Sequence, residues 1–336
     1  MRPGAGVWLA SMLALVAALA AACGSDDGDA GDGRLRVVTT VSPITSIVEQ
    51  VGGDRIALAG VVPEGVNSHT YQPAPSVARL LSDADLVVVN GLKLEEPVLR
   101  MAEANASDDA VIVQLGDRTV TPEEWVFDFS FPETEGKPNP HLWTDPILAL
   151  KYAEVVEAEL AELDPENADY YAANLEAFAA RIELLDAAIV EAVATIPEGQ
   201  RRLVTYHDSW PYFAQRYGFE VLGAVQPSDF TDPSPREVAA LIDQVRAAQV
   251  PAVFGSEVFP SDVLETIADE TGATFVADLR DDDLPGEVGD ADHSYLGLMI
   301  SNMRSMITAL GGSAAAFDGF NTSAVFEGES TAEYAS

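Results

Sequence analysis

The chain has 336 residues, of which 55 are acidic and 18 are basic, so its formal net charge is −37. Such a surface repels nucleic-acid phosphates, and because no basic stripe offsets that repulsion, we expect no nucleic acid as a partner. Hydrophobic residues make up 48% of the chain, which provides a sizeable core and argues against global disorder.

The first 22 residues are typical of a secretory signal peptide. Arg2 precedes the apolar run VWLASMLALVAALAAA, which spans residues 7–22 and ends in small residues directly before Cys23. The run is shorter than the roughly 20 apolar residues that a membrane-spanning helix needs. We therefore expect the mature chain to be secreted across the cytoplasmic membrane.

Cys23 is the only cysteine, so it cannot form a disulfide within the chain. Its position after three alanines resembles a bacterial lipobox, in which the cysteine is acylated. The resemblance implies lipid attachment at Cys23 and a protein anchored on the outer face of the membrane. Residues 23–34 are rich in glycine and aspartate, which predicts a flexible tether between the anchor and the folded body.

Residues 35–145 form the first expected folded unit. Apolar runs separated by helical stretches indicate buried parallel strands with right-handed crossovers. We expect strands at 35–40, 56–62, 85–90 and 111–115, and helices at 44–51, 76–82 and 95–104.

The same pattern restarts over residues 199–310. We expect strands at 202–207, 219–225, 252–258 and 273–278, and helices at 211–217, 235–248, 261–271 and 294–310. The predicted fold class is therefore α/β, with two doubly wound lobes built on parallel sheets. Residues 311–336 are small, polar and acidic, which predicts a disordered tail.

Residues 146–198 are expected to form connecting helices between the lobes. Asp145 before Pro146, and Asp164 before Pro165, each combine an N-cap residue with a proline at the first helical position. The second helix repeats apolar residues at alternating steps of three and four, which places them on one face. These residues are Tyr171, Leu175, Phe178, Ile182, Leu185, Ile189, Val193 and Ile196. A helix over 166–196 would be a rigid rod about 45 Å long, able to brace both lobes.

The chain has four histidines, and the context of three of them predicts a metal site. His69 follows the second expected strand, His141 precedes the first connecting helix, and His207 ends the strand at 202–207. Ligands of open α/β sheets gather beyond the carboxyl ends of the strands. Asp278, which ends the last expected strand, offers an oxygen donor at the same kind of position.

Three imidazoles and one carboxylate suit four-coordinate zinc(II). Magnesium and calcium prefer mostly oxygen ligands and fit poorly, whereas manganese(II) remains possible.

Four motifs together resemble those of the metal-specific solute-binding lipoproteins of ABC importers for zinc and manganese, the ZnuA/TroA type of cluster A-I. They are SHTYQPAPS, NPHLWTDP, YHDSWPYFAQRYGF and HSYLGLMISNM, and the resemblance covers roughly residues 35–310. It implies two α/β lobes joined by a long rigid helix, with the metal between the lobes. By position, it implies His69, His141 and His207 as nitrogen ligands and Asp278 as the carboxylate ligand.

The resemblance also implies an ABC permease and its ATPase as membrane partners, and a monomeric receptor. Manganese-binding members tend to have a glutamate where His207 stands, which favours zinc. Many zinc members have a histidine-rich loop where this chain has 121–137, a segment that lacks histidine and contains five carboxylates. Those carboxylates are expected to collect ions weakly at most.

Three further features stay open at this level. The acidic segment 280–292 is interpreted as a solvated loop, with repulsion or relay of the ion as the alternative. His293 is assigned a helix-start or outer-sphere role. Glu257 is a candidate for orienting a ligand histidine through its second ring nitrogen, and a strand-end carboxylate facing water is the alternative.

An enzyme is the main rival class. A secreted zinc hydrolase would keep one metal position open for water, whereas a fourth protein ligand is available here. The chain also lacks the HExxH, GxSxG, P-loop and GxGxxG motifs. A structural lipoprotein that holds its zinc permanently is a third class. We expect no enzymatic activity and instead an extracytoplasmic receptor that delivers zinc(II) to an ABC importer.

Overall fold

The computed structural model describes residues 33–226, 230–259, 262–277 and 279–334. The expected signal peptide, Cys23 and Asp278 lie outside the described residues. Residues from Leu35 onward form one compact unit, and the architecture below is that of this unit. In the ranges that the structure describes, no helix is both long and apolar enough to cross a membrane.

The N-terminal lobe is built on a parallel four-stranded sheet with the order β2-β1-β3-β4. Every residue of β3 is buried, as expected for a central strand covered on both faces. The strands are β1 (Leu35–Thr39), β2 (Ile56–Gly60), β3 (Leu86–Val89) and β4 (Val111–Gln114), and the helices are α2 (Ser42–Gly52), α3 (Pro75–Ser82), α4 (Glu96–Asn105) and α5 (Leu115–Thr119).

The C-terminal lobe repeats this topology with the order β6-β5-β7-β8, again fully parallel. Its strands are β5 (Arg202–Thr205), β6 (Glu220–Ala224), β7 (Ala252–Phe254) and β8 (Thr274–Val276), and its helices are α8 (Pro211–Tyr217), α9 (Pro235–Ala248) and α10 (Asp262–Thr271). In both lobes the first strand lies between the second and the third, so each sheet has a switch point where ligands bind. The predicted α/β fold of two parallel-sheet lobes is confirmed.

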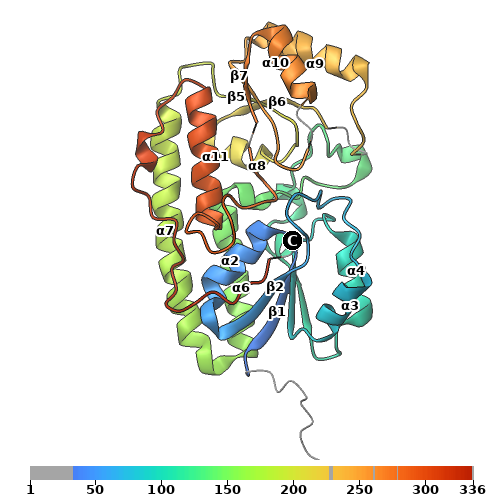
Figure 1. Cartoon of the computed structure of the whole chain (residues 1–336), viewed down its shortest axis with the longest axis vertical. Coiled ribbons are helices and arrows are strands. Elements are labelled where there is room, and N and C mark those ends of the chain that lie inside the picture. Colours follow the sequence, from blue (N-terminus) through green and yellow to red (C-terminus); the bar gives the residue numbers. More distant parts are fainter. Residues whose placement is uncertain (1–32, 227–229, 260–261, 278, 335–336) are drawn as a thin grey trace, which may run out of the picture. The chain divides into compact units, whose positions relative to one another are not determined.

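Two helices connect the sheets, α6 (Pro146–Leu163) and α7 (Ala168–Ala194). The predicted cap of α6 is confirmed, because the Asp145 carboxylate accepts the backbone N–H of Ile147 at 2.9 Å. The 27 residues of α7 span about 40 Å. Figure 1 shows α7 beside α2 of the N-terminal lobe and beside the last helix, α11 (Tyr295–Ala309).

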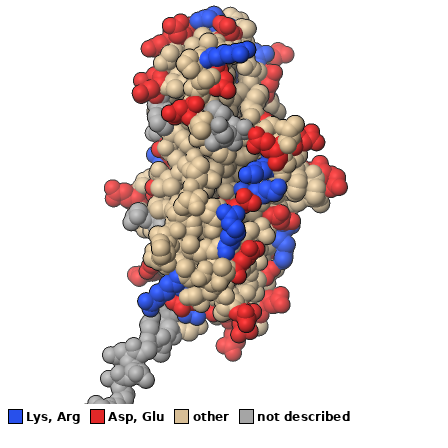
Figure 2. All heavy atoms as spheres, turned by 90° about the vertical axis from the view of Figure 1, so that its right-hand side faces the viewer, with Lys and Arg blue, Asp and Glu red and all other residues tan. Residues whose placement is uncertain are grey.

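The acidic excess is distributed unevenly over the surface. Figure 2 shows the face that lies on the right of Figure 1, where α3 and α4 are found. Lys and Arg side chains gather in a band near the middle of this view, with Asp and Glu around them.

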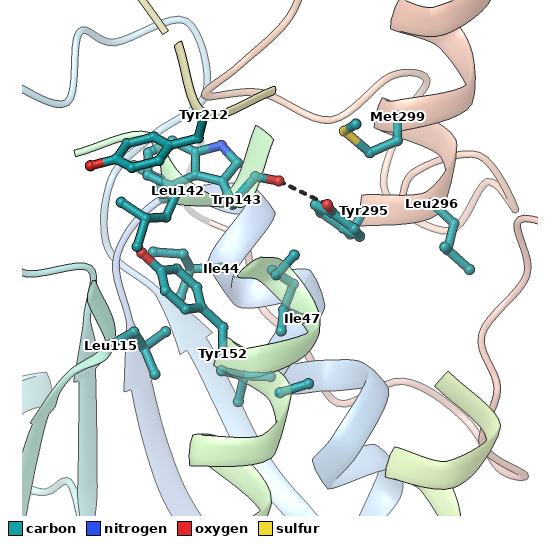
Figure 3. Close-up of a cluster of buried hydrophobic side chains, with 14 of the residues drawn as sticks. Ile44, Ile47, Leu115, Leu142, Trp143, Tyr152, Tyr212, Tyr295, Leu296 and Met299 are labelled. Atoms are coloured by element: carbon teal, nitrogen blue, oxygen red, sulfur yellow. Dashed lines mark hydrogen bonds between the residues drawn. The ribbon is translucent and has the colours of Figure 1, made fainter. Parts of the chain in front are cut away.

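A single apolar cluster joins the lobes to the connecting helices, and Trp143 lies within it, fully buried. The Tyr295 hydroxyl at the start of α11 donates to the Trp143 carbonyl at 2.8 Å (Figure 3). Tyr295 also packs against Phe178 of α7, with ring centroids 6.2 Å apart. The segment that carries His141 is therefore tied to α11, which in turn packs against α7.

The prediction of a disordered tail is wrong for the described residues of that segment, which end at Tyr334. Phe317 is fully buried, and Glu333 pairs with the edge of β2 through backbone hydrogen bonds of 2.9 Å to Gly60 and Leu58. The Tyr334 hydroxyl donates to Glu49 of α2 at 3.0 Å. Backbone pairing to a sheet edge does not depend on apolar side chains, so the composition of the tail did not reveal it.

Candidate metal centre

Three histidines from two lobes converge on one point. The Nε2 atom of His69 lies 3.2 Å from Nε2 of His141 and 3.1 Å from Nε2 of His207. Two nitrogen ligands of a tetrahedral zinc ion with bonds of 2.0–2.1 Å are separated by about 3.3–3.4 Å. The spacing of the three ring nitrogens is therefore close to that of a shared metal ion.

Each histidine is positioned by local structure. His69 lies between β2 and α3, where its backbone N–H donates to Asn67 at 3.0 Å. His141 is fully buried, and its Nδ1 atom lies 2.8 Å from Oδ1 of Asn139. His207 follows β5 by two residues, so it stands beyond the carboxyl end of that strand, where the switch-point rule predicts ligands.

The described carboxylates at this point belong to Asp281 and Asp282, whereas Asp278 lies outside the described residues. Asp281 forms an ion pair through Oδ2 with Nδ1 of His207, and the same oxygen lies 3.9 Å from Nε2 of His141. His141, Asp281 and Asp282 form a second group whose potential ligand atoms lie within 4.8 Å of one another. Oδ1 of Asp281 and Oδ1 of Asp282 are buried and have no hydrogen-bond partner among the described residues.

Residues 281–283 are held in place from both lobes. Oε1 of Glu257 accepts the backbone N–H groups of Asp281, Asp282 and Asp283 at 2.9, 3.0 and 3.1 Å. From the N-terminal lobe, the Ser68 hydroxyl donates to Asp282 at 2.7 Å. Since Ser68 directly precedes His69, the two loops that carry potential ligands are joined.

These contacts correct two expectations. The interpretation of 280–292 as a solvated loop is wrong for Asp281, Asp282 and Asp283, which are 1%, 4% and 7% exposed. Among the described residues, Glu257 makes no hydrogen bond to a histidine, and it instead fixes the backbone of the aspartate loop. The signal that could have revealed this loop is the run of three aspartates that begins five residues after the end of β8, beyond a carboxyl end of the sheet.

The other acidic segment, 121–137, contributes an aromatic wall. Phe131 is buried, and its ring centroid lies 5.5 Å from that of His69 and 5.7 Å from that of His141. Phe230 stacks on His69 from the other lobe at 4.5 Å.

His293 is not part of the histidine cluster. It lies before the N-cap of α11, with Tyr334 packed against its ring.

The electrostatics favour neutral imidazoles at two of the three histidines. Burial, followed by the neighbouring histidines, lowers the pKa of His141 well below its ordinary value. Burial, followed by His207 and Lys137, does the same to the pKa of His69. Burial also acts to lower the pKa of His207, but the Asp281 carboxylate outweighs it and raises that pKa to about 9.

The carboxylates of the aspartate loop lie so close together that the charge of one raises the pKa of its neighbour. Burial and the charge of Asp281 raise the pKa of Asp282 to about 7. A cation placed among these groups would relieve the repulsion, because a metal ion is the largest local charge in such a site. The donor set therefore favours binding a divalent cation with both nitrogen and oxygen ligands.

Two parallel α/β lobes joined by a long helix, with ring nitrogens and carboxylates converging between them, define a metal-binding solute-binding protein. The family model described as "ZnuA: Zinc-uptake complex component A periplasmic" matches residues 37–309. The chain belongs to this family.

Relatives with known names agree with this class. The manganese-binding lipoprotein MntA of Halalkalibacterium halodurans is 32% identical over 301 residues, which cover 89% of this chain and 97% of MntA. The iron-binding protein YfeA of Yersinia pestis is 30% identical over 266 residues, covering 79% of this chain and 83% of YfeA. The solved structure of the periplasmic zinc-binding protein TroA from Treponema pallidum superposes with a TM-score of 0.75 at 25% identity, covering 83% of this chain and 99% of TroA.

The chain is accordingly a metal-binding substrate-binding protein of the ABC-transporter type, and not an enzyme. Proteins of this type work with a membrane permease and an ATPase. The three relatives are named for three different metals, so their names do not determine which metal this chain binds.

Proposed function

We propose that this protein captures zinc(II) outside the cytoplasmic membrane and delivers it to the permease and ATPase of an ABC importer. It would do so as a monomer, tethered through a lipid on Cys23. The observation that carries the proposal is the convergence of three Nε2 atoms, 3.1 and 3.2 Å apart, beside a loop of buried carboxylates.

The excess of nitrogen over oxygen donors among the proposed ligands supports zinc as the bound metal. Zinc is borderline-soft and readily accepts three imidazoles, whereas manganese is better served by sites with more oxygen ligands. Manganese is the alternative cargo, and it has its own support in the manganese-binding relative MntA.

We assign the ligands to His69, His141, His207 and one carboxylate. Asp278 is the carboxylate that the resemblance implies, but Asp281 is the better candidate, because its Oδ2 atom lies 3.9 Å from Nε2 of His141. Zinc would exchange its bound waters for these four groups, and no other chemical step is needed. A fourth protein ligand closes the site to the activated water that a zinc hydrolase requires.

Calorimetric titration of the metal-stripped protein tests the proposal. One tight site for zinc, together with much weaker binding of manganese, is the expected result. Tight binding of manganese with weak binding of zinc would keep the receptor and change its cargo, and the absence of any tight site would refute the proposal.

A further inference from the structure

A pocket lies directly beside the metal centre and shares His69 with it. It has a volume of about 150 Å³, and its wall includes His69 together with Lys93, Arg100 and Lys137. Since a water molecule occupies about 30 Å³ of liquid, a pocket of this size has room for a small organic ion. The pocket therefore joins a metal-site histidine to a group of cationic side chains.

His69 differs from the other two histidines in its outer-sphere contacts. Nδ1 of His141 lies 2.8 Å from Oδ1 of Asn139, and Nδ1 of His207 is paired with Oδ2 of Asp281, which leaves Oδ1 of Asp281 for the metal. Nδ1 of His69 has no hydrogen-bond partner in the ranges that the structure describes, although His69 is only partly exposed. Metal-binding histidines almost always donate their second ring N–H to an acceptor, which fixes the ring and increases its basicity. The described residues provide no such acceptor for His69, so a molecule bound in the pocket can provide it.

The charge of the pocket indicates what kind of acceptor it can hold. The sequence contains only three lysines, Lys93, Lys137 and Lys151, and two of them line this pocket. Lys93 donates to the Gly136 carbonyl at 2.8 Å, and neither Arg100 nor Lys137 has an acidic partner among the described residues.

Two carboxylates, Glu96 and Glu135, also line the pocket, so its five charged side chains sum to +1. The band of basic side chains in Figure 2 lies on the same face as α4, whose N-terminal half contributes Glu96, Pro97 and Arg100 to the wall. On the inner side, Phe230 stacks on His69 at 4.5 Å and excludes water from that face of the ring.

We propose that this pocket binds a small carboxylate anion, which accepts the Nδ1–H of His69 and pairs with Lys93, Arg100 and Lys137. The anion would complete the outer sphere of the metal site and slow release of the ion. This inference rests on the proposed function, because it takes His69 as a ligand of the metal.

The test measures how fast zinc leaves the loaded protein when an excess of a strong chelator is added, in malonate and in chloride at equal ionic strength. Malonate is expected to slow release on the order of tenfold, the lower end of what outer-sphere contacts contribute to metal sites. The slowing should be lost in Lys137→Gln and in Arg100→Gln. It should persist in Lys151→Gln, which removes the same charge from α6, outside the pocket.

Equal release rates in malonate and chloride would overturn the inference, and so would equal slowing in Lys137→Gln and the parent protein. A second readout is independent of kinetics, because ¹⁵N spectra of the four imidazoles of the zinc-loaded protein should show malonate moving the Nδ1 signal of His69 most. If no tight zinc complex forms in chloride, the proposed function fails instead. The two failures are therefore distinguishable.

Discussion

Trp143 and Asp281 are 138 residues apart in the sequence, yet the indole N–H of Trp143 donates to the Asp281 carbonyl at 2.8 Å. Trp143 is fully buried and lies two residues after His141, and Asp281 is paired with His207. One hydrogen bond thus links the segment that carries a histidine from the N-terminal lobe to the aspartate loop of the C-terminal lobe. Metal binding and the relative position of these two loops should therefore be coupled.

This coupling predicts the effect of Trp143→Phe. The change removes the indole donor and leaves a buried carbonyl unpaired, which should cost about 1–3 kcal/mol in the free energy of unfolding. It should also weaken zinc binding, by about tenfold, because the aspartate loop loses a fixed contact. Urea unfolding of the metal-free protein and zinc titration measure the two effects.

Tyr295→Phe is the matched control, since it removes the other hydrogen bond at Trp143, the one to its carbonyl, without touching Asp281. The control should lose stability and keep its zinc affinity. If both variants bind zinc as the parent does, the link between Trp143 and the metal site is wrong.

His141→Ala should weaken zinc binding by roughly two to three orders of magnitude, if the ~10–16 kcal/mol of a four-ligand zinc site is shared among its ligands. His293→Ala makes the same chemical change at the one histidine outside the cluster, and it should leave zinc affinity near that of the parent. Circular dichroism and thermal unfolding of the metal-free variants establish that both are folded. Unchanged zinc affinity in His141→Ala would remove this residue from the site.

Asp281→Asn and Asp278→Asn distinguish the two candidates for the carboxylate ligand. Asparagine keeps the size of the side chain and removes its charge, so a ligand position should lose most of its contribution to zinc binding. We expect the larger loss of affinity in Asp281→Asn, because this side chain lies beside His141 and His207. A larger loss in Asp278→Asn would reverse the assignment.

The pH dependence of zinc binding should reflect His207. The Asp281 carboxylate raises its pKa to about 9 against the effect of burial, so the metal-free protein carries a proton on His207 at neutral pH. This proton stabilises the metal-free state, and zinc must displace it in order to bind. Affinity should therefore rise by at least about tenfold per pH unit from pH 6 to pH 8, with one proton released from His207 and, at the lower end of this range, part of a second from Asp282.

Calorimetry at pH 7.5 in two buffers with different protonation enthalpies counts the released protons. A histidine with its ordinary pKa near 6.5 would already be neutral there, and affinity would then level off above about pH 7.5. Little or no proton release at pH 7.5 would contradict the interaction between Asp281 and His207.

Local signals in the sequence predicted most helices and strands, but they missed α5, and the Asp164–Pro165 signal opens a short 3-10 turn before α7 and not α7 itself. The bounds of α8 and α9 agree with those predicted, because each helix has a proline in its first turn and a clear end. For α8 that end is Gly218, whose φ of 73° is a left-handed conformation that glycine adopts without strain. The carboxyl-end rule likewise placed His207 correctly beyond β5.

The aspartate loop could not be predicted in the same way. Which of several neighbouring carboxylates reaches the histidines depends on the path of an irregular loop, and this path is set by contacts with Glu257 and Ser68. Both residues are far from the loop in the sequence, and no periodic pattern encodes their contacts. The tail was missed for a related reason, since Glu333 pairs with β2 through backbone atoms alone.

X-ray absorption at the zinc edge of the protein loaded with one equivalent of zinc tests the central claim most directly. A site built from His69, His141, His207 and one carboxylate predicts four ligands, zinc–nitrogen distances near 2.0–2.1 Å and the multiple-scattering signature of about three imidazoles. A zinc ion surrounded by oxygen ligands, with no imidazole scattering, would contradict the account.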